Sequence, residues 1–394
     1  MKIPTFLISL FFLTALFAQS QESNALQTSP QNIKQWQTAV EASAFSGLVL
    51  VAHKGEALFQ YKFGLANREE NIPFSQESIF DIGSITKQFT ATAIMQLSEA
   101  GKLSVQEPIT RFFKNVPVDK QNITLHHLLT HSSGLPQGFG LYQKVDKHAF
   151  LQEVMSAELI AAPGTEYHYS NVGYNLLASI IESVTGQNQE EYVLKNILYP
   201  AGLSETGYQL VEREPARLVI NYGRDPNWLQ RLFMLTADSQ SVGHSLQHHH
   251  RDPGPRWYIH GAGGFLSTTY DMLRWYQTLR TRPENILQKA SWDKLFTPYI
   301  AEQNKNTEKL TSHYGYGWSI DRDEHGNERI SHSGSNGYNL SEFTYYPTLD
   351  VFIFKTTNNW DDSPEDLIKQ FDALILEQIL PEQKKKKLAQ SQLN

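Results

Sequence analysis

The stretch GLVLVAHKGEALFQY (residues 47–61) predicts the fold of the chain. Residues 47–52 form a continuous apolar run that is typical of a buried strand, and residues 57–61 form a second run. Lys54 and Gly55 lie between the two runs, and a short connection that contains Gly favours a β-hairpin. The sequence therefore predicts antiparallel pairing near its start.

Strand patterns return near the end of the chain, whereas its middle has helical periodicity. Further strands are expected at residues 316–320, 328–331, 342–346 and 351–356. The strongest helical patterns cover residues 85–100, 171–184 and 268–279. These patterns predict an α+β fold, in which one antiparallel β-sheet is flanked by helices and a mostly helical lobe, about residues 84–282, is inserted. We expect the active site at the junction of sheet and lobe.

The two ends of the chain are expected to lie outside this domain, which is assigned to residues 33–380. Residues 1–20 resemble a signal peptide, with Lys2 before an apolar run and small residues at Ala18 and Ser20. The run is shorter than the roughly 20 residues that span a bilayer, so no transmembrane span is expected after cleavage. Residues 21–32 are polar and predict a flexible leader, and residues 381–394 a basic disordered tail. Within the domain, residues 204–259 look irregular.

The composition excludes several classes of function. The net charge of −7 argues against a nucleic-acid partner, which requires a basic surface. The chain has no cysteine, so disulfides, thiolate metal sites and cysteine nucleophiles are excluded. Together with the signal peptide, this favours a periplasmic or secreted bacterial protein. The oligomeric state cannot be predicted from the sequence.

Ser84 and Lys87 form an S-x-x-K motif at the start of a predicted helix. Residues three apart on a helix share a face, so the hydroxyl and the amine can meet. A serine needs an adjacent base to become nucleophilic, and a lysine whose pKa is lowered by burial can supply it. An N-cap serine followed by a surface lysine is the alternative for a lone match.

Two further motifs follow, Tyr169-Ser170-Asn171 and His332-Ser333-Gly334. A tyrosine near a lysine is a candidate general base and later general acid, and the Asn171 amide can orient lysine and substrate. Gly334 would let a substrate lie alongside the strand, and the Ser335 N–H could join that of Ser84 in an oxyanion hole. His332 would donate to Tyr169 or to a substrate carboxylate. The alternatives are a packed Tyr169, Asn171 as a helix cap and a structural His332.

The order of these motifs resembles the serine β-lactamase and penicillin-binding protein superfamily. The similarity is closest to its class C β-lactamase-like branch of D-Ala-D-Ala carboxypeptidases, D-aminopeptidases and esterases. Flanking stretches support it: FDIGSITKQFTA (80–91), ITLHHLLTHSSGLP (123–136), GAGG (261–264) and YGYGW (314–318). The resemblance implies an acyl-enzyme on Ser84, with proton transfer by Lys87 and Tyr169 and no cofactor.

The resemblance also implies the substrate class. β-Lactamases of this group carry Lys-Thr-Gly at the third motif, whereas His332 stands here, which favours a D-amino-acid peptide or a small ester as substrate. A true β-lactamase and a non-catalytic sensor of cell-wall peptides or penicillin are the alternatives. His127, His131 and the triplet 248–250 suggest a metal site, but the first two fall in a family stretch and the triplet has no acidic partner, so no metal is expected.

Overall fold

The computed structural model describes residues 30–43, 45–139, 145–224, 239–245, 257–303, 309–360, 363 and 370–376. The chain divides into two compact units, one of which is Val40–Glu365 and contains all the predicted motifs. The other unit combines the two ends of the chain. In it, Trp36 of α1 (Pro30–Glu41) packs against Phe371, with ring centroids 4.1 Å apart. The predicted signal peptide and basic tail lie outside the described residues.

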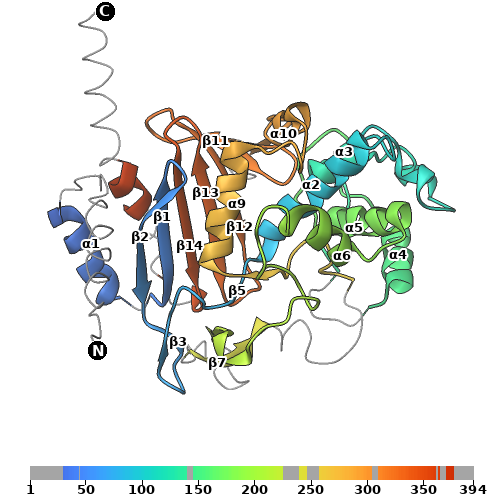
Figure 1. Ribbon diagram of the computed structural model, residues 1–394. Helices are drawn as coiled ribbons and strands as arrows, with labels where there is room; N and C mark the ends of the chain where they lie inside the picture. The colour runs from blue at the N-terminus through green and yellow to red at the C-terminus, as the bar shows by residue number, and fades with distance from the viewer. Residues whose placement is uncertain are drawn as a thin grey trace, which may run out of the picture. The chain divides into compact units, whose positions relative to one another are not determined.

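The larger unit is built on an eight-stranded antiparallel sheet (Figure 1). Its first and last strands in sequence, β1 and β14, lie side by side, with Gly47 paired to Thr357, so segments about 300 residues apart in sequence are joined in one sheet. In spatial order the strands are β2 (Glu56–Phe63), β1 (Gly47–His53), β14 (Val351–Thr357), β13 (Leu340–Tyr346), β12 (Glu328–Gly334), β11 (Ser319–Arg322), β10 (Leu310–Tyr314) and β9 (Ile300–Gln303). All residues of β14 are buried, including Lys355, whose ammonium pairs with the Glu342 carboxylate at 2.9 Å.

Helices gather beside this sheet and over one of its faces (Figure 1). The central helix is α2 (Thr86–Glu99), whose first ten side chains are all buried. A helix that is covered on all sides belongs to the core, and α2 therefore gives the active site a rigid base. The other α-helices in the described part of the unit are α3 (Leu125–Leu129), α4 (Lys147–Ser156), α5 (Asn171–Thr185), α6 (Gln189–Val193), α9 (Thr269–Thr281), which contacts β1 and β14, and α10 (Lys289–Leu295).

Three short antiparallel pairs complete the unit. The pair of β5 (Phe80–Asp81) with β8 (Leu266–Ser267) matters most, because β5 leads into the turn that carries Ser84. β3 (Leu65–Asn67) pairs with β4 (Ile72–Pro73). β6 (Ile220–Gly223) pairs with β7 (Gln240–His244), so the described part of residues 204–259 contains regular structure that the sequence did not predict.

The α+β fold and the early hairpin are confirmed, and one strand is corrected. The predicted strand at residues 316–320 begins only at Ser319. Gly317 has φ +82°, and the Gly315 N–H donates to the Trp318 carbonyl, so these residues form a tight turn. β9 and β10 were not predicted, because neither has a clear alternation of apolar and polar residues.

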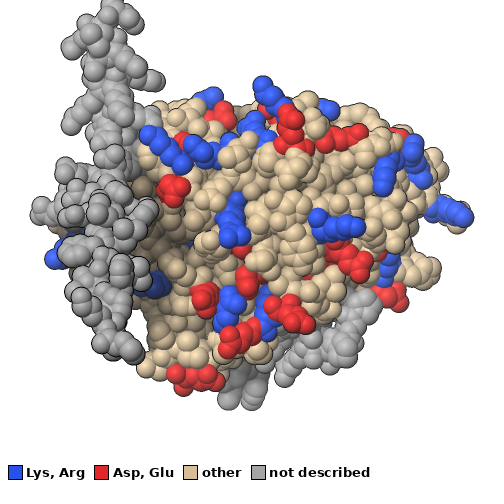
Figure 2. Space-filling model, in the orientation of Figure 1, with Lys and Arg blue, Asp and Glu red and all other residues tan. Residues whose placement is uncertain are grey.

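One face of the described surface carries charges of both signs. Figure 2 shows acidic and basic side chains interspersed over one face, without a large area of either sign. None of the helices in the described part of the chain is long and apolar enough to cross a membrane.

Candidate active site

Ser84 lies in a short 3₁₀ turn, η1 (Gly83–Ile85), between β5 and α2. The turn is fixed at both ends. The Asp81 carboxylate accepts the Gly83 N–H at 2.7 Å, and the Thr86 hydroxyl donates to the Gly83 carbonyl at 2.7 Å. Gly83 has φ +49°, a conformation that favours glycine. These contacts hold the Ser84 hydroxyl at the start of α2, at the surface of a pocket.

Lys87 is completely buried, one turn along α2. Its Nζ lies 3.0 Å from Ser84 Oγ, 2.7 Å from Asn171 Oδ1 and 2.5 Å from the Ala262 carbonyl oxygen. Burial lowers the pKa of Lys87 well below its usual value, because the charged form loses its hydration. In its neutral form the amine has two N–H groups; if these donate to the Asn171 and Ala262 oxygens, the lone pair is left to face Ser84 Oγ. The S-x-x-K prediction of a buried, paired lysine is thus the geometry found.

Tyr169 completes the group around Ser84. Lys87 Nζ lies 4.8 Å from the centroid of the Tyr169 ring, so the phenol stands beside the lysine. Burial raises the pKa of Tyr169 above its usual value, and the Ser84 hydroxyl offsets part of that change. These opposite shifts favour the neutral form of the lysine as well as that of the phenol.

The start of α5 explains how Asn171 reaches Lys87. The sequence offered Asn171 as the helix cap, but the N-cap is Ser170, whose hydroxyl accepts the Gly173 N–H at 3.2 Å. The same hydroxyl donates to the Pro136 carbonyl at 2.7 Å. Since Ser170 caps the helix, the Asn171 side chain is left to bind the lysine.

The opposite wall of the site is made of backbone. β12 packs directly on η1, and an ideal Cβ at Gly334 would overlap the Ile82 carbonyl and lie 2.5 Å from the Ser84 nitrogen. A Cβ at Gly83 would likewise overlap the Ser335 nitrogen. The two glycines thus bring the amides of Ser84 and Ser335 next to each other. The missing side chain of Gly334 serves this contact within the protein, whereas a substrate beside the strand stays a prediction.

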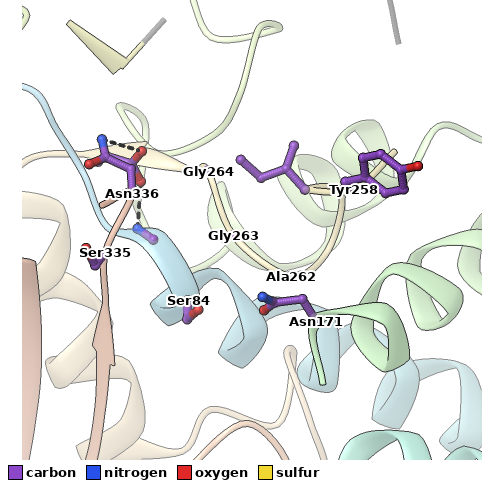
Figure 3. Close-up of a pocket in the computed structure, with 11 residues that line it drawn as sticks. Ser84, Asn171, Tyr258, Ala262, Gly263, Gly264, Ser335 and Asn336 are labelled. Carbon is purple, nitrogen blue, oxygen red and sulfur yellow. Dashed lines mark hydrogen bonds between the residues drawn. The ribbon is translucent and has the colours of Figure 1, made fainter. Parts of the chain in front are cut away.

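A pocket that is open to solvent lies over these groups. Figure 3 shows Ser84 between Ser335 on one side and Asn171 on the other. Part of the lining consists of apolar side chains and main-chain atoms. This part comprises Tyr258, Ile259, Ala262, Gly263 and Gly264. Asp81, Gly83 and Asn336 complete the lining. The site is therefore a small cleft with one nucleophile at its base.

Comparison with known proteins assigns the family. A family model described as "Beta-lactamase" matches residues 31–377, which is most of the chain. The chain belongs to the β-lactamase family. Its coarse function follows from that membership and from the relatives below: it is a serine hydrolase with the β-lactamase fold.

Three relatives illustrate the range of this family. Penicillin-binding protein 4* of Bacillus subtilis (strain 168) is 28% identical over 344 residues, 84% of this chain and 72% of that protein. Esterase EstB of Burkholderia gladioli is 28% identical over 267 residues, 62% of this chain and 67% of that protein. The solved structure of a penicillin-binding protein from Bacillus halodurans has a TM-score of 0.70 and 29% identity, and the match covers 86% of this chain and 98% of that one.

The predicted donor role of His332 does not fit this β-lactamase-family site. Nδ1 lies 2.6 Å from the Ser333 carbonyl oxygen, which can only accept, so Nδ1 carries the proton. Nε2 therefore accepts from the Tyr314 hydroxyl at 2.8 Å. Burial lowers the pKa of His332 to about 3, so the ring is neutral. With both nitrogens engaged, His332 has no donor left for Tyr169 or for a substrate carboxylate.

His131 contributes to the site in a way that the sequence did not reveal. It is fully buried, and its Nδ1 accepts the Ser170 N–H at 3.0 Å, which assigns the proton to Nε2. Its ring centroid lies 4.3 Å from that of Tyr169 and 4.6 Å from that of Tyr314. Burial lowers the pKa of His131 well below its usual value. His131 therefore acts as a neutral support beneath Tyr169.

No group of three His, Cys, Asp or Glu side chains that could hold a metal ion occurs among the described residues. His127 is used locally, because its Nδ1 accepts the Thr124 N–H at 3.3 Å in the cap of α3. The histidine triplet at 248–250 lies outside the described residues.

Proposed function

We propose that this serine hydrolase forms an acyl-enzyme on Ser84 and hydrolyses a small ester or a D-amino-acid peptide. The observation that carries the proposal is the position of Ser84 Oγ, 3.0 Å from the Nζ of the buried Lys87, which itself lies 4.8 Å from the centroid of the Tyr169 ring. A nucleophile within reach of a base, itself oriented by a third group, is the arrangement that covalent acyl transfer needs. Here Asn171 orients the base.

The resting protonation states give Lys87 and Tyr169 different tasks. Because Lys87 is neutral, its lone pair takes the Ser84 proton as Oγ bonds to the substrate carbonyl carbon. The carbonyl oxygen becomes an oxyanion, and the amides of Ser84 and Ser335 are placed to donate to it. Tyr169, whose proton is held tightly, then protonates the leaving nitrogen or oxygen as its bond to carbon breaks.

The second half of the reaction reverses these transfers. The Lys87 ammonium returns a proton to Tyr169, which restores the resting pair. Water then attacks the acyl carbon and gives a proton to the lysine, and Ser84 regains a proton as its bond to the acyl carbon breaks. No cofactor is needed for any of these steps.

The pocket and the relatives guide the choice of substrate. Among the residues that line the pocket, Asp81 is the charged one, and its carboxylate is engaged with Gly83 and Asn336. The lining around Tyr258 and Ile259 thus suits an uncharged acyl group. The relatives named as an esterase and as penicillin-binding proteins support esters and cell-wall peptides as the classes to test. The predicted signal peptide supports action outside the cytoplasm.

The test is a substrate panel on the purified protein with one pair of variants. The panel holds p-nitrophenyl acetate and butyrate, D-Ala-D-Ala peptides, D-amino-acid amides and nitrocefin. We expect turnover of an ester or a D-amino-acid substrate, and complete loss of it in Ser84→Ala. Ser156→Ala, an exposed serine in α4, is the matched control and should behave like the wild type.

Each other outcome has a defined meaning. Activity retained in Ser84→Ala would show that the nucleophile is misassigned. Fast nitrocefin turnover would identify a true β-lactamase. A stable penicillin adduct without turnover of any substrate would identify a sensor. The last two results would contradict the proposed substrate class and leave the nucleophile in place.

A further inference from the structure

Asp81 lies beside the active site but takes no part in the proton transfers described above. It is buried, and its two carboxylate oxygens have different partners. Oδ1 accepts the Gly83 N–H at 2.7 Å, and Oδ2 accepts the Asn336 Nδ2–H at 3.3 Å. Gly83 directly precedes Ser84, and Asn336 directly follows Ser335. One carboxylate therefore connects the immediate neighbours of the two proposed oxyanion donors.

Asn336 is itself held firmly on the other side of this bridge. Its Nδ2 also donates to the Ser245 hydroxyl at 2.9 Å, and its Oδ1 accepts the N–H groups of Tyr338 and Asn339 at 3.0 and 3.1 Å. These bonds fix the turn between β12 and β13, on which Ser335 lies. The side chain is buried, so each lost bond would leave a polar group without a partner.

The main chain of Asp81 is tied to the same turn. Its carbonyl oxygen accepts from Asn339 Nδ2 at 2.6 Å and from the Ser341 hydroxyl at 2.8 Å. A single residue at the end of β5 thus contacts the nucleophile turn through one carboxylate oxygen and the β12–β13 turn through three other bonds. The two turns come from segments about 250 residues apart, so their relative position depends on such cross-links.

We propose that Asp81 and Asn336 form a positioning pair that sets the spacing of the Ser84 and Ser335 amides for the developing oxyanion. The inference rests on the proposed acyl-enzyme function. Oxyanion donors act only when they lie within about 2.7–3.1 Å of the oxygen in the tetrahedral intermediate. A shift of a few tenths of an ångström between the two turns would weaken this contact and leave the nucleophile and its base unchanged.

The hydrogen-bond polarity of the pair provides a sharp test. In Asp81→Asn, Oδ1 can still accept from Gly83, but the new amide N–H faces the N–H of Asn336. In Asn336→Asp, two carboxylates face each other. The double variant Asp81→Asn/Asn336→Asp restores one donor and one acceptor in the reverse direction, and the Ser245 hydroxyl can donate to the new carboxylate.

We expect each single variant to lose about 10- to 100-fold in kcat with KM changed less than about 3-fold, by comparison with removed oxyanion donors. The double variant should regain at least about tenfold over Asn336→Asp, which is the more disruptive single change. The measurement is steady-state hydrolysis of the panel's best substrate, with thermal midpoints recorded for every variant. Asp293→Asn, which alters an exposed surface carboxylate, is the control and should match the wild type.

A purely structural role would give a different pattern. The thermal midpoint would then fall while kcat stayed within about twofold, and that result would overturn the inference, as would a double variant no better than the worse single one. If Asp81→Asn fails to fold, Asn336→Ala carries the test, since it leaves the Asp81–Gly83 bond intact. An unchanged kcat there would equally overturn it. Ser84→Ala distinguishes failure of the proposed function from failure of the positioning pair. If Ser84→Ala stays active, the proposed acyl-enzyme function is wrong. If Ser84→Ala is inactive while the Asp81 and Asn336 variants stay fully active, only the positioning pair is refuted.

Discussion

One wall of the active site is built from main-chain atoms, and the facing wall is built from side chains. The wall formed by Gly83 and Gly334 brings two backbone segments into direct contact and presents the amides of Ser84 and Ser335. The facing wall presents side chains from the starts of two helices, with Lys87 as its buried centre. The first wall offers fixed dipoles, and the second offers groups that change protonation.

This difference shows which substitutions each wall tolerates. Backbone amides do not depend on the side chain that they carry, so the first wall is sensitive to added volume and to the spacing of its segments. The second wall depends on the pKa values of particular groups, which burial shifts in opposite directions for Lys87 and Tyr169. Variants can therefore damage one wall and leave the other intact.

The largest effect is expected from Tyr169→Phe, which removes a proton donor from the side-chain wall and keeps the ring. We expect kcat/KM to fall by about 10³- to 10⁴-fold, the upper part of the range for general acid–base catalysis. The loss should be smaller for an activated p-nitrophenyl ester than for an amide, because a good leaving group needs less protonation. Equal losses for both, or an unchanged rate, would remove Tyr169 from the role of acid.

Gly334→Ala tests the backbone wall by volume alone. Its Cβ would overlap the Ile82 carbonyl and force β12 away from Ser84, so we expect kcat to fall by about 10²- to 10³-fold, as when an oxyanion donor is lost. Steady-state kinetics and thermal unfolding are measured on the same preparations.

Gly101→Ala is the matched control for that variant. Gly101 has φ +66°, and nothing lies within 4 Å of its Cβ position, so alanine should cost about 1 kcal/mol of stability. Its kcat should be unchanged. If Gly334→Ala kept full kcat at a similar loss of stability, the backbone wall would not act in catalysis.

The smallest expected effect is the dependence of kcat/KM on pH. The active form needs neutral Lys87, so kcat/KM should decrease as the pH falls through the lowered pKa of Lys87 in the folded protein. The two histidines do not cause this decrease of kcat/KM at acid pH, because burial lowers the pKa of His332 to about 3 and that of His131 well below its usual value. On the alkaline side, the raised pKa of Tyr169 keeps the acid protonated beyond its usual range.

His332→Gln checks that assignment. We expect a loss of about 2- to 10-fold, the value of one neutral hydrogen bond, and an acid limb at the same pH as in the wild type. The kcat/KM profile is measured from about pH 5 to pH 10, above the lowered pKa of His332. If the decrease of kcat/KM at acid pH moved to another pH or disappeared in His332→Gln, the titrating group would be His332 instead of Lys87.

Local features of this chain could be predicted from sequence, and contacts between distant segments could not. The β1–β2 hairpin follows from Lys54-Gly55 between two apolar runs, and α5 ends at Gly186 in the left-handed conformation that ends many helices. The motif residues around Ser84 were found because their spacing is local. Their proximity to Tyr169 and Asn171 was expected from the family resemblance.

The supporting residues carried no such signal. His131 and Asn336 look like ordinary loop residues in the sequence, because their importance comes from partners on other segments, such as Ser170 and Asp81. His332 was found by its motif, but its hydrogen-bond partner Tyr314, which lies on the unpredicted strand β10, was not. Burial and partner identity are tertiary properties, and a pattern along the chain does not contain them.

The most direct test of the central claim is the site of covalent labelling. The purified protein is treated with a fluorophosphonate, which reacts with activated serines, and the modified peptide is identified by mass spectrometry. We predict one adduct, on the Ser84 hydroxyl, formed more slowly at a pH that protonates Lys87 and absent from Ser84→Ala. An adduct on another serine, or no reaction under conditions where the protein turns over its substrate, would contradict the account.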